Sequence, residues 1–170
     1  MSVHRKPAPH NIVNLNQDIV KKFNANQNNN DIRKTHLFEG RYENIYLSEQ
    51  QIPELKILID EAVSLAEDIL MVKNISAGYW FNAMPPESTT TLHSHDDFDE
   101  LLSAVYYLHV PEDSGNLIVY NKTVNNKEEK IEITPHAGEF IFFKPDIKHE
   151  VGRNNSNEYR LSIGINFGVK

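Results

Sequence analysis

The chain has 170 residues, no cysteine and a formal net charge of -7, which suits one domain with a sizeable core. Without cysteine there are no disulfides, thiolate zinc sites or iron–sulfur clusters, so His, Asp, Glu or backbone oxygen must hold any metal. The negative charge and the lack of a basic patch argue against nucleic acid or an anionic membrane as a partner. No stretch has the length of a membrane-spanning helix or the core of a signal peptide, so we expect a cytoplasmic protein.

The first 35 residues are polar and rich in asparagine, above all from Asn24 to Asn30. Such a composition offers little apolar surface to bury. We therefore expect residues 1–35 to be a flexible arm with one short helix around 17–23, and residues 36–170 to be a single domain. The arm is a candidate for a lid or for self-association, and the oligomeric state is not predictable from the sequence.

A helix is predicted after residues 48–51, where Ser48 and Gln51 form a capping-box pattern. The apolar residues that follow have helical spacing, and the charged residues between them fall mostly on the other side. This pattern indicates one amphipathic helix with a face to lay on a sheet. Its apolar positions are Leu55, Leu58, Ile59, Ala62, Leu65, Ala66 and Ile69.

From residue 75 onward the sequence changes to short runs with the period of strands, separated by residues typical of turns. Many short strands at this spacing predict a mainly β fold, a jelly roll supported by the preceding helix. A further strand is expected over residues 37–47. The candidate strands of the main region are 76–83, 89–97, 101–110, 116–122, 130–134, 139–144, 148–153 and 159–169.

Two groups of residues suggest a metal site and an anion site. His95, Asp97 and His149 offer two imidazoles and one carboxylate, the set that holds one face of a non-haem Fe(II) ion and leaves other positions open. Arg160 and Ser162 share one face of the last strand, because side chains alternate along a strand. An arginine there can donate two parallel hydrogen bonds to a carboxylate.

Several short motifs of the sequence together resemble those of the 2-oxoglutarate- and Fe(II)-dependent oxygenases. The resemblance is nearest to the prolyl-hydroxylase-like branch and to small bacterial and phage 2OG-Fe(II) oxygenases, and it runs from about residue 75 to the C-terminus. It implies a double-stranded β-helix, Fe(II) as cofactor, and 2-oxoglutarate and O2 as cosubstrates. The motifs on which the resemblance rests are His95-Asp96-Asp97, residues 103–108 (SAVYYL), 114–117 (SGNL), 135–143 (PHAGEFIFF), 149–151 (HEV) and 160–163 (RLSI).

The resemblance also implies roles for individual residues. His95, Asp97 and His149 would hold the iron, and Arg160 with Ser162 would bind the distal carboxylate of 2-oxoglutarate. The enzyme would hydroxylate its substrate with release of succinate and CO2. The substrate itself is left open among a free amino acid, a peptide side chain and a small metabolite. Residues expected to contact cosubstrate or substrate are Tyr79, Trp80 and Asn82.

Three alternatives remain at this stage. The small bacterial members carry His-x-His at the first ligand position, and His93-Ser94-His95 fits that pattern, so that His93 would replace Asp97. A cupin-type site without 2-oxoglutarate would instead use His93, His95, Glu100 and His149, and would give Arg160 no role. A jelly roll without any metal would have no need of His149 for its function.

Overall fold

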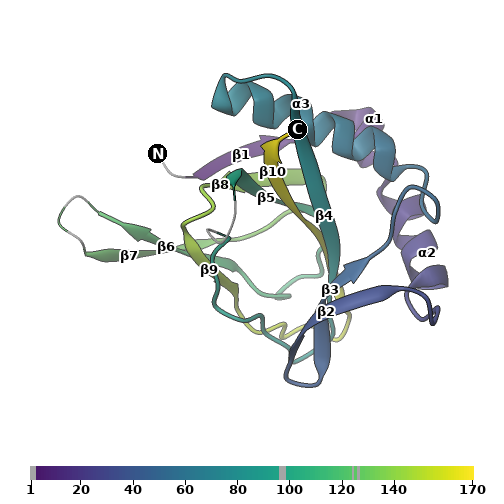
Figure 1. The fold of residues 1–170 in the computed structure, drawn as a ribbon. Coiled ribbons are helices and arrows are strands. Elements are labelled where there is room, and N and C mark those ends of the chain that lie inside the picture. Colours follow the sequence, from purple (N-terminus) through teal and green to yellow (C-terminus); the bar gives the residue numbers. More distant parts are fainter. Residues whose placement is uncertain (1–2, 96–98, 124, 126) are drawn as a thin grey trace.

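The computed structural model describes residues 3–95, 99–123, 125 and 127–170. They form a seven-stranded antiparallel sheet in the order β1-β8-β5-β10-β4-β3-β2 and a three-stranded antiparallel sheet in the order β7-β6-β9. The three helices gather on one side of the large sheet, and the β6-β7 hairpin extends away from the other side (Figure 1). The elements are β1 (Val3–Pro7), α1 (His10–Val13), α2 (Asn16–Asn26), β2 (Arg33–Phe38), β3 (Arg41–Tyr46), α3 (Leu55–Leu70), β4 (Ile75–Met84), β5 (Glu100–His109), β6 (Leu117–Lys122), β7 (Glu128–Ile133), β8 (Glu139–Phe143), β9 (Lys148–Val151) and β10 (Arg160–Val169).

The side chains of β10 divide the molecule into two apolar cores. On one face, Leu161, Ile163, Ile165 and Phe167 are fully buried in a core that includes the apolar faces of α2 and α3. The other face of the large sheet meets the small sheet across a second core, to which Tyr107 and Phe143 contribute from the large sheet and Leu117, Val119 and Val151 from the small one. The predicted mainly β jelly roll with a supporting helix is therefore confirmed.

The predicted amphipathic helix is α3, which begins at Leu55 and ends at Leu70. Ahead of it, Gln51 Oε1 accepts hydrogen bonds from the backbone N–H of Ser48 (2.8 Å) and from its hydroxyl (2.9 Å), which closes the turn that leads into the helix. Met71 ends the helix in the left-handed conformation. Among the helices of the described residues, none is long and apolar enough to cross a membrane.

Residues 3–35 differ from the flexible polar arm expected from their composition. Strand β1 pairs with β8 along its whole length, and Ile12, Ile19 and Phe23 are almost completely inaccessible. Asn16 of α2 accepts a buried hydrogen bond of 2.7 Å from the hydroxyl of Tyr106. An average over a polar segment hides a few apolar residues spaced so that they fall on one face of short helices.

Two strand predictions are corrected. Residues 37–47 form part of a hairpin, β2 and β3, because Glu39 and Gly40 both have positive φ and reverse the chain in two residues. Residues 89–95 of the predicted strand 89–97 form no strand, and residues 96 and 97 lie outside the described residues. Within that segment His93 forms an isolated bridge with His149 of β9. Side chains replace some of the hydrogen bonds of a regular strand pair, since Glu43 accepts from the backbone N–H of Thr91 and Thr90 accepts from that of Val151.

Replacing Phe23 by alanine tests whether the N-terminal segment belongs to the core. The Phe23 ring is fully buried and stacks on Phe81 at 4.9 Å between centroids. Phe23→Ala should lower the free energy of unfolding by about 3 kcal/mol, since a buried phenylalanine leaves a cavity. Urea denaturation measures this loss. Lys21→Ala, an exposed change on the same helix, should stay within about 0.5 kcal/mol of the wild type, and equal stability of both variants would mean that the segment is a detached arm.

Candidate metal centre

Three histidines come together at the mouth of the space between the two sheets. His93 and His95 lie in the segment between β4 and β5, and His149 lies in β9. Each can direct a ring nitrogen so that the three nitrogens lie within 4.8 Å of one another. The segment is fastened to β9 by two backbone hydrogen bonds, from His93 to His149 (3.1 Å) and from His149 to His93 (2.8 Å), so backbone pairing sets the spacing of these two ligands.

Backbone carbonyls orient two of the three rings. His93 Nδ1 lies 2.8 Å from the carbonyl of Thr91, and His149 Nδ1 lies 3.0 Å from the carbonyl of Ile147. A carbonyl oxygen only accepts, so each Nδ1 must carry the proton and each Nε2 must carry the lone pair. This is how ligating histidines are commonly held in metalloproteins.

Burial keeps His149 neutral. Its side chain is 6% exposed, and its ring packs on Phe143 at 4.7 Å between centroids. Burial first, and the neighbouring His93 second, lower the pKa of His149 to about 3. At neutral pH this imidazole is therefore unprotonated, the form that binds a metal ion.

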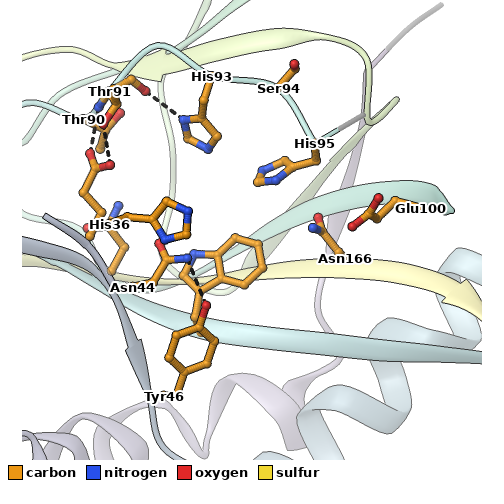
Figure 2. Close-up of a pocket in the computed structure, with 13 residues that line it drawn as sticks. His36, Asn44, Tyr46, Thr90, Thr91, His93, Ser94, His95, Glu100 and Asn166 are labelled. Atoms are coloured by element: carbon orange, nitrogen blue, oxygen red, sulfur yellow. Dashed lines mark hydrogen bonds between the residues drawn. The ribbon is translucent and has the colours of Figure 1, made fainter. Parts of the chain in front are cut away.

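A hollow of about 390 Å³ opens beside His93 and His95. Figure 2 shows His36, Asn44 and Tyr46 of the β2-β3 hairpin on one side of it, with Glu100 and Asn166 at the far end. His36 is exposed and also lines the hollow.

The buried carboxylate of Glu43 shapes the wall of this hollow. It accepts hydrogen bonds from the backbone N–H (2.7 Å) and the hydroxyl (2.5 Å) of Thr91, and Arg41 lies 3.9 Å away. These contacts hold the chain two residues ahead of His93, and the Thr91 carbonyl in turn accepts the hydrogen bond that orients the His93 ring.

All three residues expected to contact cosubstrate or substrate lie on strand β4. Trp80 and Asn82 line the hollow, whereas Tyr79 packs partly against the core on the helix side and lines a second hollow nearby. The indole of Trp80 lies against Gly164 of β10, where an added Cβ would come within 2.5 Å of the ring. Glycine at this position is therefore what leaves room for the indole beside His95, whose ring is 5.5 Å away.

Arg160 is a buried cation without an acidic partner among the described residues. Its side chain is 1% exposed, and its guanidinium lies 5.0 Å from the centre of the Tyr107 ring. One nitrogen, Nη1, donates a hydrogen bond of 3.0 Å to the carbonyl of Gly115, but the buried Nε has no hydrogen-bond partner in the described part of the chain. An unpaired buried charge costs several kcal/mol, so this arginine fits a site completed by an anion.

Two hydroxyls near Arg160 are also buried and lack an acceptor within the described ranges. The Tyr107 hydroxyl lies beside the Arg160 guanidinium, which can only donate to it, so the hydroxyl proton has no acceptor among the described residues. Burial raises the pKa of Tyr107 to about 12, so this group stays a donor. Ser114, next to the Gly115 carbonyl that binds Arg160, carries the other. Together with the guanidinium they form donors of the kind that a carboxylate satisfies. The sequence pattern gave no signal for either hydroxyl, because tyrosine is an ordinary strand residue and serine an ordinary turn residue.

The structure brings together part of each predicted ligand set. His95 and His149 lie in the close group, together with His93 from the alternative assignment. Asp97 lies outside the described residues. Glu100, the carboxylate of the cupin alternative, lines the same hollow but does not belong to the close group. Ser162 is buried on the same face of β10 as Arg160.

The chain matches a family of known proteins and shares its fold with several solved structures. Residues 78–166 match the family described as "Putative 2OG-Fe(II) oxygenase", and no curated protein matches. Among solved structures, a Pseudomonas putida prolyl-4-hydroxylase is 18% identical, with a TM-score of 0.73 over 98% of this chain and 92% of that one.

Two further structures share the fold. A Trichoplax adhaerens prolyl hydroxylase, in complex with a hypoxia inducible factor peptide fragment, is 13% identical, with a TM-score of 0.72 over 98% of this chain and 83% of that one. The epimerase SnoN, in complex with Fe3+, alpha ketoglutarate and nogalamycin RO, is also 13% identical, with a TM-score of 0.74 over 99% of this chain and 79% of that one.

The buried neutral state of His149 predicts a pH dependence of stability for the metal-free protein. Below a pH of about 6.5 the unfolded chain takes up a proton that folded His149 accepts only near pH 3. Stability should therefore fall as the pH is lowered from 6.5 towards 3, by up to about 1.4 kcal/mol per pH unit from this group. Urea denaturation at pH 7 and pH 5 measures the slope. His149→Gln should show a shallower slope than the wild type, and parallel curves would contradict the assignment.

Proposed function

Since the chain belongs to the 2OG-Fe(II) oxygenase family, we propose that it hydroxylates a substrate held in the hollow beside His93 and His95, with 2-oxoglutarate anchored by Arg160. The protein is an enzyme of that family and uses Fe(II), 2-oxoglutarate and O2. Hydroxylation converts the 2-oxo acid to succinate and CO2 as the substrate gains a hydroxyl group. What the proposal adds is the assignment of roles to residues of this chain.

The buried, unpaired guanidinium of Arg160 is the observation that carries the proposal. It supports a role in binding the distal carboxylate of 2-oxoglutarate, because Nε, the Tyr107 hydroxyl and the Ser114 hydroxyl are all buried donors that lack an acceptor within the described part of the chain. Ser162, on the same face of β10, adds a further hydroxyl. A carboxylate would satisfy these donors and neutralise the cation in one step.

His95, Asp97 and His149 are proposed to hold the iron. Both imidazoles fit that task, because His149 is neutral and oriented through Nδ1, and His95 has a ring nitrogen within 4.8 Å of a His149 ring nitrogen. Bound in this way, Fe(II) supplies the redox chemistry that activates O2. The carboxylate of Asp97 would lower the charge of the site, which a third neutral histidine would not do. His93 is the competing third ligand.

The rest of the chain orients the cosubstrate and shields it from water. Tyr107, Phe143, Ile147 and Val151 form the apolar core between the sheets on which His149 and Arg160 border. In such surroundings the charged hydrogen bonds to a carboxylate are stronger than in water. The substrate would enter from the side of the hollow, which the β2-β3 hairpin and Trp80 border.

Substrate identity and location in the cell are proposed only coarsely. The hollow suits a small molecule or a peptide side chain. The negative net charge supports neither nucleic acid nor an anionic membrane as a target, and a cytoplasmic location stays a prediction from the sequence. The cupin alternative gains no support, since it leaves Arg160 unexplained.

The first experiment is an anaerobic titration with Fe(II) and then 2-oxoglutarate, followed by the visible metal-to-ligand charge-transfer band. Arg160→Ala should weaken 2-oxoglutarate binding by about 30-fold or more, because truncating a buried charged partner removes at least about 2 kcal/mol. Arg153→Ala removes an exposed arginine paired with Glu87 and should leave the titration unchanged. A band of normal affinity in Arg160→Ala, with the fold intact by thermal unfolding, would contradict the assignment of Arg160.

A second pair of variants identifies the third iron ligand. Asp97→Ala should lower Fe(II) affinity by about 100-fold, since it removes the only anionic ligand proposed, whereas His93→Ala should lower it by about tenfold at most. Isothermal titration under anaerobic conditions measures both constants. The reverse order of effects would assign His93 in place of Asp97, and His149→Ala serves as the variant in which binding is lost on either assignment.

A further inference from the structure

The hollow beside the histidines continues into a second one. The second hollow has a volume of about 680 Å³ and lies over the ends of β4, β5 and β10. Four residues line both hollows, namely Tyr46, Trp80, Glu100 and Asn166. They mark the junction at which a substrate that reaches the histidines would be held along its length.

The charged residues that line the two hollows in the described part of the chain are all acidic. They are Glu43, Asp99 and Glu100, and neither lining includes a described lysine or arginine. Glu43 is already engaged by Thr91. Arg41 lies 3.9 Å from Glu43. Arg33 lies over the ring of Tyr46 without being part of either lining. The lining carboxylates left to attract a cation are therefore Asp99 and Glu100.

Glu100 has a carboxylate oxygen that requires a partner. Its Oε2 is buried, and no described residue forms a hydrogen bond with it. Burying a carboxylate oxygen without a hydrogen-bond donor costs more free energy than burying a neutral acceptor in the same way. The residue stands at the first position of β5, where the large sheet fixes its backbone and turns the side chain towards Asn166 and His95 in Figure 2.

The indole of Trp80 lies at the same junction and can face a cation. Aromatic rings attract ammonium and guanidinium groups over their faces, and tryptophan does so most strongly. The ring is held by its contact with Gly164, where any side chain would displace it. An aromatic face and an unsatisfied carboxylate at one junction recognise a positively charged group better than a neutral or acidic one.

We propose that the substrate carries an ammonium or guanidinium group, held at the junction of the two hollows by Glu100 and the face of Trp80 while the atom to be oxidised lies beside the histidines. This inference deepens the proposed function and rests on it for the identity of the reaction. It concerns the substrate class and assigns Glu100 to substrate recognition in place of metal binding. The group can belong to a free amino acid or to a basic side chain within a peptide.

Trp80 provides a readout inside the site, because it is the only tryptophan of the chain. The full-length protein is titrated, with and without Mn(II), with L-lysine and with acetyl-Gly-Lys-Gly-amide while tryptophan fluorescence is recorded. L-Norleucine and acetyl-Gly-norleucine-Gly-amide are the matched probes, since they keep the aliphatic side chain and lack the side-chain ammonium group. Comparing the free amino acid with the peptide distinguishes the two sources of the cation.

At least one lysine probe should bind with about tenfold or higher affinity than its norleucine match, and Glu100→Gln should remove that preference. Glu112→Gln, a change of an exposed carboxylate outside both hollows, should preserve it. Equal responses to lysine and norleucine in both metal states, or a lysine preference that survives in Glu100→Gln, would overturn the proposal.

The outcome can be separated from that of the proposed function. A lysine preference without a charge-transfer band would leave the cation site standing and remove the assignment of Arg160 and the iron ligands. A band without a lysine preference would do the opposite. Thermal unfolding of Glu100→Gln shows that a lost response reflects recognition and not the fold.

Discussion

Strand β10 runs through the middle of the large sheet, paired with β4 on one side and β5 on the other, and its two faces carry opposite chemistry. Its apolar residues from Leu161 to Phe167 pack the helices against the sheet. Because side chains alternate along a strand, the residues between these apolar ones must point to the opposite face. Arg160 and Ser162 are thus held in the interior by the same register that builds the core. A shift of the strand register by one residue would move the apolar side chains to the site and the polar side chains into the core. The same register is therefore required for the fold and for the site.

The backbone around Arg160 is irregular where the site needs it. The pairing of β10 with β5 shifts register between Leu161 and Ser162, which leaves Leu108 unpaired and brings Tyr107 opposite Ser162. Bulges of this kind redirect side chains and are common beside active sites. Gly115, whose carbonyl binds Arg160, has a positive φ and sits so close to Gly152 that a Cβ would come within 2.3 Å of its carbonyl oxygen. The bulge in β10 and the positive φ of Gly115 therefore both help to position the Arg160 guanidinium.

The sequence predicted what depends on periodicity and missed what depends on tertiary contacts. Helix α3 and most strands followed from the spacing of apolar residues, as did the common face of Arg160 and Ser162. The burial of Phe23 could not be read from a segment whose composition is polar on average. The pairing of His93 with His149 could not be read either, because it joins residues far apart in the chain through an isolated bridge. Local alternation had predicted a strand there.

The distribution of charge gives the interior a polarity that suits two ligands of opposite sign. Arg160 is fully buried and lines neither hollow, whereas Glu100, whose Oε2 has no hydrogen-bond partner among the described residues, lies at their junction. The ring of His149 stays neutral because burial lowers its pKa, so it adds no charge that would favour either ligand. With the proposed roles, an acidic cosubstrate would be stabilised next to Arg160 and repelled by Glu100. A cationic substrate experiences the reverse. The two ligands would then be sorted by electrostatics before any specific contact forms, and neither would compete for the place of the other.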